Sequence, residues 1–232
     1  MSLVDAGQIA QPGCPQPQPQ APPLAGRPAL ARGLQRACDL ALAGGVFLAL
    51  VPLMLVISLC ILVADGRPCL FRQARIGRGG QVFQCLKFRT MAPDSERRLR
   101  DILASDPSAR TAWARDHKLI RDPRVTPLGR VLRKLSLDEL PQLINVLRGD
   151  MALIGPRPIV AEEIPRYGRY FAYYIAVKPG LTGLWQVSGR SRTTYRRRVA
   201  ADCYYVRRRS LRLKLWILFQ TIPAVLLAEG SA

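Results

Sequence analysis

The sequence predicts an α+β fold, mainly helical, that is attached to a membrane near its N-terminus. Three observations lead to this prediction. Residues 40–64 carry no charged side chain, whereas the rest of the chain carries all 35 Lys and Arg and all 16 Asp and Glu. One strand-like segment, 81–88, stands between long helix-prone segments. The length of 232 residues suffices for one ordinary domain with a membrane segment, but not for a multidomain protein.

The basic residues indicate an anionic partner. Thirty of them are Arg and only five are Lys, and the formal net charge is +19. Because the planar guanidinium forms paired hydrogen bonds to phosphates and carboxylates, this composition favours binding of nucleic acid, a phospholipid surface or phosphorylated small molecules.

Several classes of catalytic site are excluded by what the sequence lacks. His117 is the only histidine, which argues against His-based triads and metal sites. The six cysteines occur singly, so a reducing compartment is expected rather than a zinc site or a disulfide scaffold. The phosphate-binding patterns GxxxxGKS, GxxxxGKT and GxGxxG are absent, and so is Asp-x-Asp. An acid, base or nucleophile must therefore come mainly from the 16 carboxylates.

The N-terminal part is predicted as a tail followed by a membrane helix. Residues 1–33, rich in Pro, Gln and Ala, have little apolar surface to bury and are expected to be disordered. Residues 34–66 contain the uncharged run, which as a helix is about 37 Å long against a hydrocarbon core of roughly 30 Å. Pro52 interrupts its middle, and Arg residues flank both ends. A re-entrant helix keeps both flanks on one side, but a spanning helix that tolerates the Pro stays open.

Residues 67–232 are predicted to form a cytoplasmic domain with interfacial helices. A strand over 81–88 follows a glycine-rich turn. Helices are expected over 93–117, 128–135, 137–147 and 194–228. The last of these segments is first very basic and then mostly apolar, with Gln220 and Pro223 as interruptions, which is typical of helices that lie on a membrane surface.

The stretch Ser136-Leu137-Asp138-Glu139-Leu140-Pro141-Gln142 is the most informative for chemistry. Ser136 and Glu139 fit a capping box, or Asp138 is itself the N-cap with Pro141 in the first turn. Both alternatives place adjacent carboxylates at the positive end of a helix, where they stay ionised and where a phosphate can be received. One carboxylate could attack phosphorus and the other could hold a divalent cation. The pattern alone, however, is common as a simple helix cap.

Basic side chains surround this stretch in the sequence. They are Arg124, Arg130, Arg133, Lys134, Arg148 and Arg157, with Lys87 and Arg89 earlier in the chain and Lys178 later. A nucleotide diphosphate needs such neutralisation. The plainer interpretation is a solvated basic surface, which accounts for most of the 30 Arg residues.

From these motifs the chain is identified as similar to the bacterial sugar transferase family, monotopic phosphoglycosyl transferases that load a sugar 1-phosphate onto a polyprenyl phosphate. The resemblance covers about residues 34–225. It is carried by FRQARIGRGGQVFQCLKFRTM (71–91), DPRVTPLGRVLRKLSLDELPQLINVLRGDMALIGPRP (122–158), KPGLTGLWQVSGR (178–190) and DCYYVRRRSLRLKLWIL (202–218).

The resemblance implies roles for individual residues. Asp138 would be the nucleophile that forms a covalent phosphosugar, and Glu139 would coordinate Mg²⁺. The implied substrate-binding residues are Lys87, Arg89, Arg133, Arg157 and Pro158. Pro52 matches the break of a re-entrant membrane helix, although Val51 stands where the family commonly has Ser.

The resemblance also implies the reaction and its place. A UDP-hexose would donate hexose 1-phosphate to undecaprenyl phosphate with release of UMP, to start an exopolysaccharide. The protein would act at the cytoplasmic face of the bacterial inner membrane, bound to its anionic phospholipid surface. The oligomeric state stays open, with a homodimer as one alternative.

Two other functions compete with this interpretation. A nucleic-acid-binding membrane protein would use the same positive charge. However, the sequence has no helix-turn-helix or RNA-binding signature, and its strongest motif is acidic. No nucleic-acid partner is therefore expected. A non-catalytic scaffold of the same family would not need an intact Asp138 and Glu139.

Overall fold

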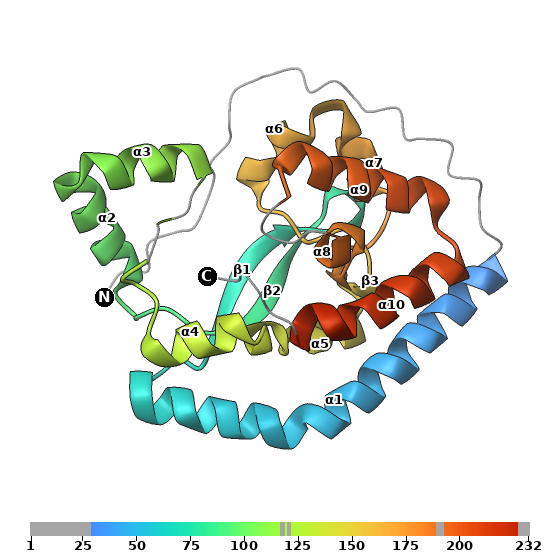
Figure 1. Cartoon of the computed structure of the whole chain (residues 1–232). Coiled ribbons are helices and arrows are strands. Elements are labelled where there is room, and N and C mark those ends of the chain that lie inside the picture. Colours follow the sequence, from blue (N-terminus) through green and yellow to red (C-terminus); the bar gives the residue numbers. More distant parts are fainter. Residues whose placement is uncertain (1–28, 117–118, 120–121, 189–192, 227–232) are drawn as a thin grey trace, which may run out of the picture.

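The computed structural model describes residues 29–116, 119, 122–188 and 193–226 (Figure 1). Helices surround two small two-stranded sheets, so the predicted α+β, mainly helical class is confirmed. Most of the predicted tail lies outside the described residues. The first helix begins at Ala29, earlier than the predicted boundary at residue 34.

The helices and strands follow one another in this order. The first half of the chain forms α1 (Ala29–Asp65), β1 (Leu70–Ile76), β2 (Val82–Phe88), α2 (Ser95–Ser105), α3 (Pro107–Asp116) and α4 (Pro127–Lys134). The second half forms α5 (Gln142–Arg148), β3 (Ala152–Ile154), α6 (Ile164–Tyr167), α7 (Phe171–Ile175), β4 (Gly180–Thr182), α8 (Leu184–Ser188), α9 (Tyr195–Arg208) and α10 (Leu211–Leu226). Short 3₁₀ turns lie at Arg78–Gly80, Leu137–Glu139, Ala161–Glu163 and Gly168–Tyr170.

Helix α1 is long, apolar and largely uncovered. It continues through Pro52, and Figure 1 shows that it changes direction near its middle. Within the described residues, only the helical stretch 36–64 is long and apolar enough to cross a membrane. Just 11% of its most apolar window is buried against the rest of the fold, so α1 is not an ordinary core helix. The membrane segment predicted from the sequence therefore has the required length and exposure.

The hairpin of β1 and β2 carries part of the candidate site. The strands pair antiparallel from Leu70 opposite Phe88 to Ile76 opposite Val82, with Gly79 and Gly80 at positive φ in the turn. The predicted strand at 81–88 is confirmed, starting one residue later. Because successive residues of a strand alternate between faces and paired residues share a face, Arg75, Cys85 and Lys87 all lie on one side of the hairpin.

Helix α5 connects the hairpin to α1. Asn145 of α5 is fully buried; its Oδ1 accepts from the Leu86 N–H at 3.0 Å, and its Nδ2 donates to Gln84 O at 2.8 Å. On the other side, Arg36 of α1 donates to the carbonyls of Val146 and Leu147 at 2.8 and 3.1 Å. These carbonyls belong to the last turn of α5, where a helix lacks internal donors.

The C-terminal segment is divided between packing and exposure. The helices predicted over 194–228 are confirmed as two, which separate at 209–210, and α9 turns Val199, Asp202 and Val206 into the core. Helix α10 buries Ile217 and exposes an apolar row on its other side. That row consists of Leu211, Leu215, Trp216, Phe219 and Ile222. The predicted helix over 93–117 is likewise two helices, α2 and α3, because Pro107 cannot continue α2.

Candidate active site

The two adjacent carboxylates lie in a 3₁₀ turn ahead of α5, and neither predicted cap forms. Ser136 adopts φ 57° and ψ 19°, and its side chain does not cap the turn. Pro141, not Asp138, is the N-cap residue of α5. Both capping alternatives are therefore wrong, because the left-handed Ser136 ends the approach from α4 and the next helix begins only at Gln142. The positive end of α5 is correspondingly a weaker influence on the carboxylates than the sequence indicated.

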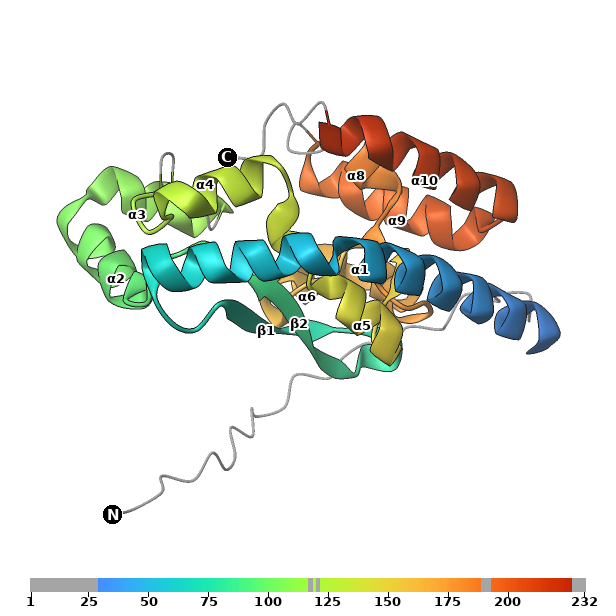
Figure 2. The ribbon, with the colours of Figure 1, turned by 90° about the horizontal axis from the view of Figure 1, so that it is seen from below.

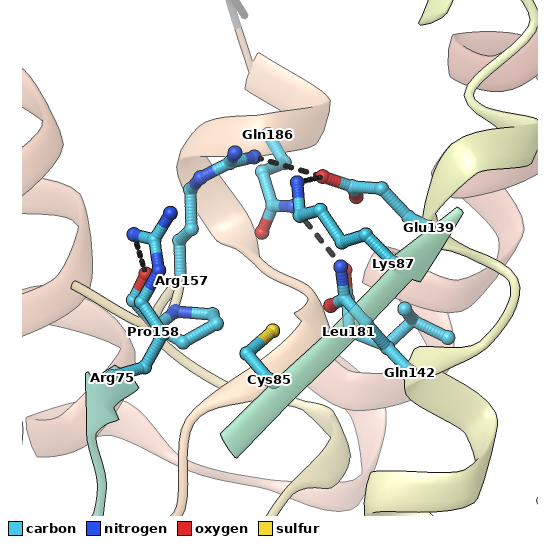
Figure 3. A pocket seen from close by; sticks show the side chains of 10 residues that line it. Arg75, Cys85, Lys87, Glu139, Gln142, Arg157, Pro158, Leu181 and Gln186 are labelled. Carbon is cyan, nitrogen blue, oxygen red and sulfur yellow. Dashed lines mark hydrogen bonds and ion pairs between the residues drawn. The ribbon is translucent and has the colours of Figure 1, made fainter. Parts of the chain in front are cut away.

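Glu139 is held by two cations. Lys87 Nζ lies 2.8 Å from Glu139 Oε1, and Arg157 Nη1 lies 3.5 Å from the same oxygen (Figure 3). Burial alone would raise the pKa of the Glu139 carboxyl, but Lys87, Arg157 and Arg75 together lower it to about 2. Glu139 is therefore ionised at every physiological pH, and its second oxygen, Oε2, takes no part in these ion pairs.

Asp138 has a different environment from its neighbour. Among the described residues, no hydrogen bond or ion pair involves its carboxylate. Burial raises its pKa above the usual value for Asp, and the ionised Glu139 acts in the same direction. Lys87, Arg133 and Arg157 oppose this rise. The expectation that a helix end keeps Asp138 ionised is thus replaced by a balance between burial and three nearby cations.

The structure brings most of the predicted binding residues together. Lys87, Arg157 and Pro158 line one small pocket with Glu139. Arg133 lies beside this pocket, close enough to influence Asp138, and its Nε donates to Thr90 Oγ1 at 2.8 Å. Gly129 allows α4 to approach Thr90 closely, since a side chain at Gly129 would collide with the Thr90 backbone.

Arg89 lies elsewhere. It is 6% exposed, and its Nη2 donates to the carbonyls of Asp65 and Gly66 at 2.7 and 2.8 Å. The side chain thus ties the end of α1 to the end of β2, and it does not line the pocket. Pro52, the predicted break, lies within α1 and not at the site.

Sequence reasoning did not single out four residues that line or adjoin the pocket. Arg75, Gln142 and Gln186 line it, and the pKa of the Arg198 guanidinium on α9 is lowered by burial and by the nearby Arg157. All but Arg198 lie within the stretches that carry the family resemblance, but composition and spacing gave no reason to choose them. Arg198 was counted among the arginines of a basic helix, and only the fold shows that it faces inward, with its guanidinium 4.4 Å from the centre of the Trp185 ring.

The pocket carries more positive than negative charge. Arg75, Lys87 and Arg157 face Glu139, with Asp138 beside them, and Arg198 adds a further cation. Within the described part of the chain, no three His, Cys, Asp or Glu side chains form a cluster that could hold a metal. Such a site suits a phosphorylated ligand, and a Mg²⁺ ion only if the ligand's phosphates complete its coordination.

A long exposed apolar helix that is compatible with membrane association, joined to a cation-rich pocket with two adjacent carboxylates, is the arrangement expected of an enzyme that acts on phosphorylated substrates near a membrane. The chain belongs to the bacterial sugar transferase family, which it matches over residues 30–228, and it is therefore a transferase. This confirms the family resemblance that the motifs indicated.

Curated relatives agree with this assignment. The chain is 47% identical over 197 residues to the exopolysaccharide production protein ExoY of Sinorhizobium fredii, covering 85% of this chain and 87% of that protein. It is 46% identical over 200 residues to the undecaprenyl-phosphate galactose phosphotransferase of Salmonella typhimurium, covering 86% of this chain but only 42% of that protein. It is 38% identical over 210 residues to the UDP-glucose:undecaprenyl-phosphate glucose-1-phosphate transferase of Caulobacter vibrioides, covering 85% and 71%.

Proposed function

We propose that the protein transfers hexose 1-phosphate from a UDP-sugar to undecaprenyl phosphate, with release of UMP, as the initiating step of exopolysaccharide synthesis. The names of the Salmonella and Caulobacter relatives support the lipid acceptor, and the latter also supports a UDP-sugar donor. The name of the Sinorhizobium relative supports the exopolysaccharide pathway.

The mechanism rests on one observation: Glu139 and Asp138 differ in their ion-pair partners. Lys87 and Arg157 are both paired to Glu139, whereas Asp138 has no ion-pair or hydrogen-bond partner within the described residues. A carboxylate without such partners can approach phosphorus, and one held between cations cannot easily do so. We therefore assign the nucleophile to Asp138 and a fixed electrostatic role to Glu139.

The reaction then proceeds in two displacements at the same phosphorus. An Asp138 carboxylate oxygen attacks the sugar-bearing phosphorus, the bond from that phosphorus to the bridging oxygen breaks, and UMP leaves with the bond's electron pair. An oxygen of undecaprenyl phosphate next attacks the aspartyl phosphosugar and restores the carboxylate. Lys87, Arg133 and Arg157 offset the repulsion between anionic reactants. Two steps also avoid holding two anionic substrates in the site at once.

Mg²⁺ fits this site only in a shared arrangement. Glu139 is ionised, and its Oε2 is outside the ion pairs with Lys87 and Arg157, so Glu139 would hold the ion, with Asp138 near it. Because Mg²⁺ commonly uses one or two carboxylates together with substrate phosphates, the small number of acidic ligands is compatible with it. When bound, the ion would neutralise charge on the diphosphate.

The membrane would contact α1 and α10. Figure 1 shows α10 next to the first half of α1, Figure 2 shows both from below, and residues of both helices contribute to one core cluster. The exposed apolar row of α10 adjoins Arg207, Arg208 and Arg212, a combination that suits the surface of an anionic leaflet. We propose that α1 enters and leaves by the cytoplasmic face of the inner membrane, with the bend near Pro52 at its deepest point.

Incubation with a UDP-sugar in the absence of lipid acceptor tests the proposal. We expect one UMP per enzyme and one sugar phosphate on the peptide that contains Asp138. Asp138→Asn should lose both signals, while Asp101→Asn, a change in an exposed part of α2, should keep them. Intersecting initial-rate patterns without a trapped intermediate would instead indicate a ternary complex.

A further inference from the structure

Two glutamine side chains form an uncharged part of the pocket wall, beside the cations. Gln142 is the first residue of α5 and Gln186 lies in α8, and Figure 3 shows Gln186 next to Arg157 and Lys87. Gln142 is 2% exposed, and it lines the same pocket as Gln186. Neutral amides at this position contribute no charge to phosphate binding, so they call for a different explanation.

The orientation of the Gln186 amide is determined by its surroundings. Nε2 donates to Leu181 O at 3.2 Å, and since a carbonyl oxygen only accepts hydrogen bonds, the nitrogen must be the atom that faces it. Gln186 Oε1 is consequently left as a buried acceptor, and the described residues provide no donor for it. Buried acceptors in native proteins are nearly always paired, with protein, water or ligand.

Unpaired donors lie in the same region. The Nε atoms of Arg75 and Arg198 are buried and lack a hydrogen-bond partner within the described residues. Arg75 lines the pocket, and Arg198 lies over Trp185, the residue next to Gln186. The complementary ligand therefore offers anionic oxygens to the arginines and, close to them, an O–H or N–H group to Gln186.

We infer that Gln186, with Gln142 beside it, recognises an uncharged hydrogen-bond donor of the nucleotide sugar next to its diphosphate. This inference rests on the proposed function. The required chemistry exists in two parts of a UDP-sugar: the hydroxyls of the sugar, and the imide N–H of the uracil base. Gln186 would thus contribute to donor specificity, whereas Lys87 and Arg157 bind phosphate without regard to what it carries.

The test combines one enzyme variant with substrate analogues. UMP release is measured for the wild type and Gln186→Met with a UDP-hexose that the wild type accepts, with its monodeoxy analogues, and with its N3-methyluracil analogue. We expect Gln186→Met to lower kcat/KM about ten- to hundredfold with the intact donor. The analogue that lacks the partner group should slow the wild type by a similar factor but slow Gln186→Met little further, because the lost contact is the same.

Gln84→Met is the matched control, since the Gln84 side chain is exposed on β2, and it should behave as wild type. If the losses in kcat/KM from Gln186→Met and from a deoxysugar analogue are not multiplicative, the sugar is the partner of Gln186. If this holds for the N3-methyl analogue instead, the base is the partner. The inference is wrong if Gln186→Met has the same kcat/KM as Gln84→Met. It is also wrong if the loss in kcat/KM from Gln186→Met multiplies with the loss from every analogue, and in both cases water pairs with Gln186 Oε1. Gln142→Met undergoes the same comparison if Gln186→Met does not fold. A wild type that releases no UMP from any UDP-sugar would refute the proposed function itself.

Discussion

Asp202 provides a prediction that is independent of the reaction. It is 3% exposed in the core, where its Oδ2 accepts a 2.6 Å hydrogen bond from Tyr167 Oη. Burial raises the pKa of Asp202 to about 7, although the Tyr167 hydrogen bond and the nearby Arg198 act in the opposite direction. In the unfolded chain the pKa returns to about 3.9. Since the folded state binds the proton more tightly, stability is full below pH 4 and is lost as the pH rises towards 7.

The magnitude follows from these two pKa values. Between pH 5 and pH 8 the loss amounts to roughly 3 kcal/mol, which for a domain of this size corresponds to a fall of about 6–12 °C in Tm. Asp202→Asn keeps the shape and still accepts from Tyr167, but it cannot ionise. We therefore expect the difference in Tm between Asp202→Asn and wild type to grow with pH over this range.

Thermal unfolding in nanodiscs at a series of pH values measures this difference, and all other titrating groups cancel in the comparison. Asp101→Asn, which removes an exposed carboxylate, controls for the change in net charge. Parallel Tm profiles for wild type and Asp202→Asn would show that Asp202 ionises in the folded protein as easily as in the unfolded chain, and the argument from burial would fail.

Three further predictions concern the metal, the membrane helix and the lipid surface. Glu139→Gln should reduce turnover by two or more orders of magnitude, because it removes the charge that positions Lys87 and Arg157. Excess chelator should stop wild-type turnover, and full activity in chelator would contradict a role for Mg²⁺. Pro52→Ala should favour a helix that spans the membrane, because the substitution restores a helical hydrogen bond. Cysteines introduced on both sides of residues 40–64 should then be labelled from opposite sides of the membrane. In the protein with Pro52, both cysteines should react only from the cytoplasm. Replacement of Arg208 and Arg212 by Gln should weaken binding to anionic vesicles and leave binding to neutral vesicles unchanged; reduced RNA binding with unchanged vesicle binding would disprove the membrane interpretation.

The parts of the fold that the sequence predicted are those with a strong local signal. The uncharged run 40–64 lies within α1, although the helix begins earlier, at Ala29, and the strand-like segment after the glycine-rich turn matches β2 except for its first residue. The parallel pair of β3 and β4 is only three residues on each strand and joins segments far apart in the chain, so no local pattern marked it. The division of 93–117 into two helices was in principle readable at Asp106-Pro107.

The candidate site shows the same distinction. Asp138, Glu139, Lys87 and Arg157 were identified from motifs, and the structure places them together. Arg89 belongs to the same motif as Lys87, but it lies just after the end of β2 and donates to the carbonyls at the end of α1. Gln186 and Arg198 could not be selected, because their relevance depends on which polar atoms remain unpaired after folding, and that depends on tertiary contacts.

The attachments of α1 have a consequence for where the reaction takes place. Arg36 joins the first half of α1 to the end of α5, while Arg89 and Thr126, the latter through a 2.9 Å hydrogen bond to Asp65 Oδ2, hold its other end. Asn145 in turn fixes α5 to the strand that carries Lys87. Hydrogen bonds therefore run from α1 through α5 to the strand that carries Lys87. In the membrane arrangement that we propose, the depth and tilt of α1 therefore set the height of the pocket above the bilayer, so that a change in bilayer thickness would move Asp138 relative to the phosphate of the proposed lipid acceptor.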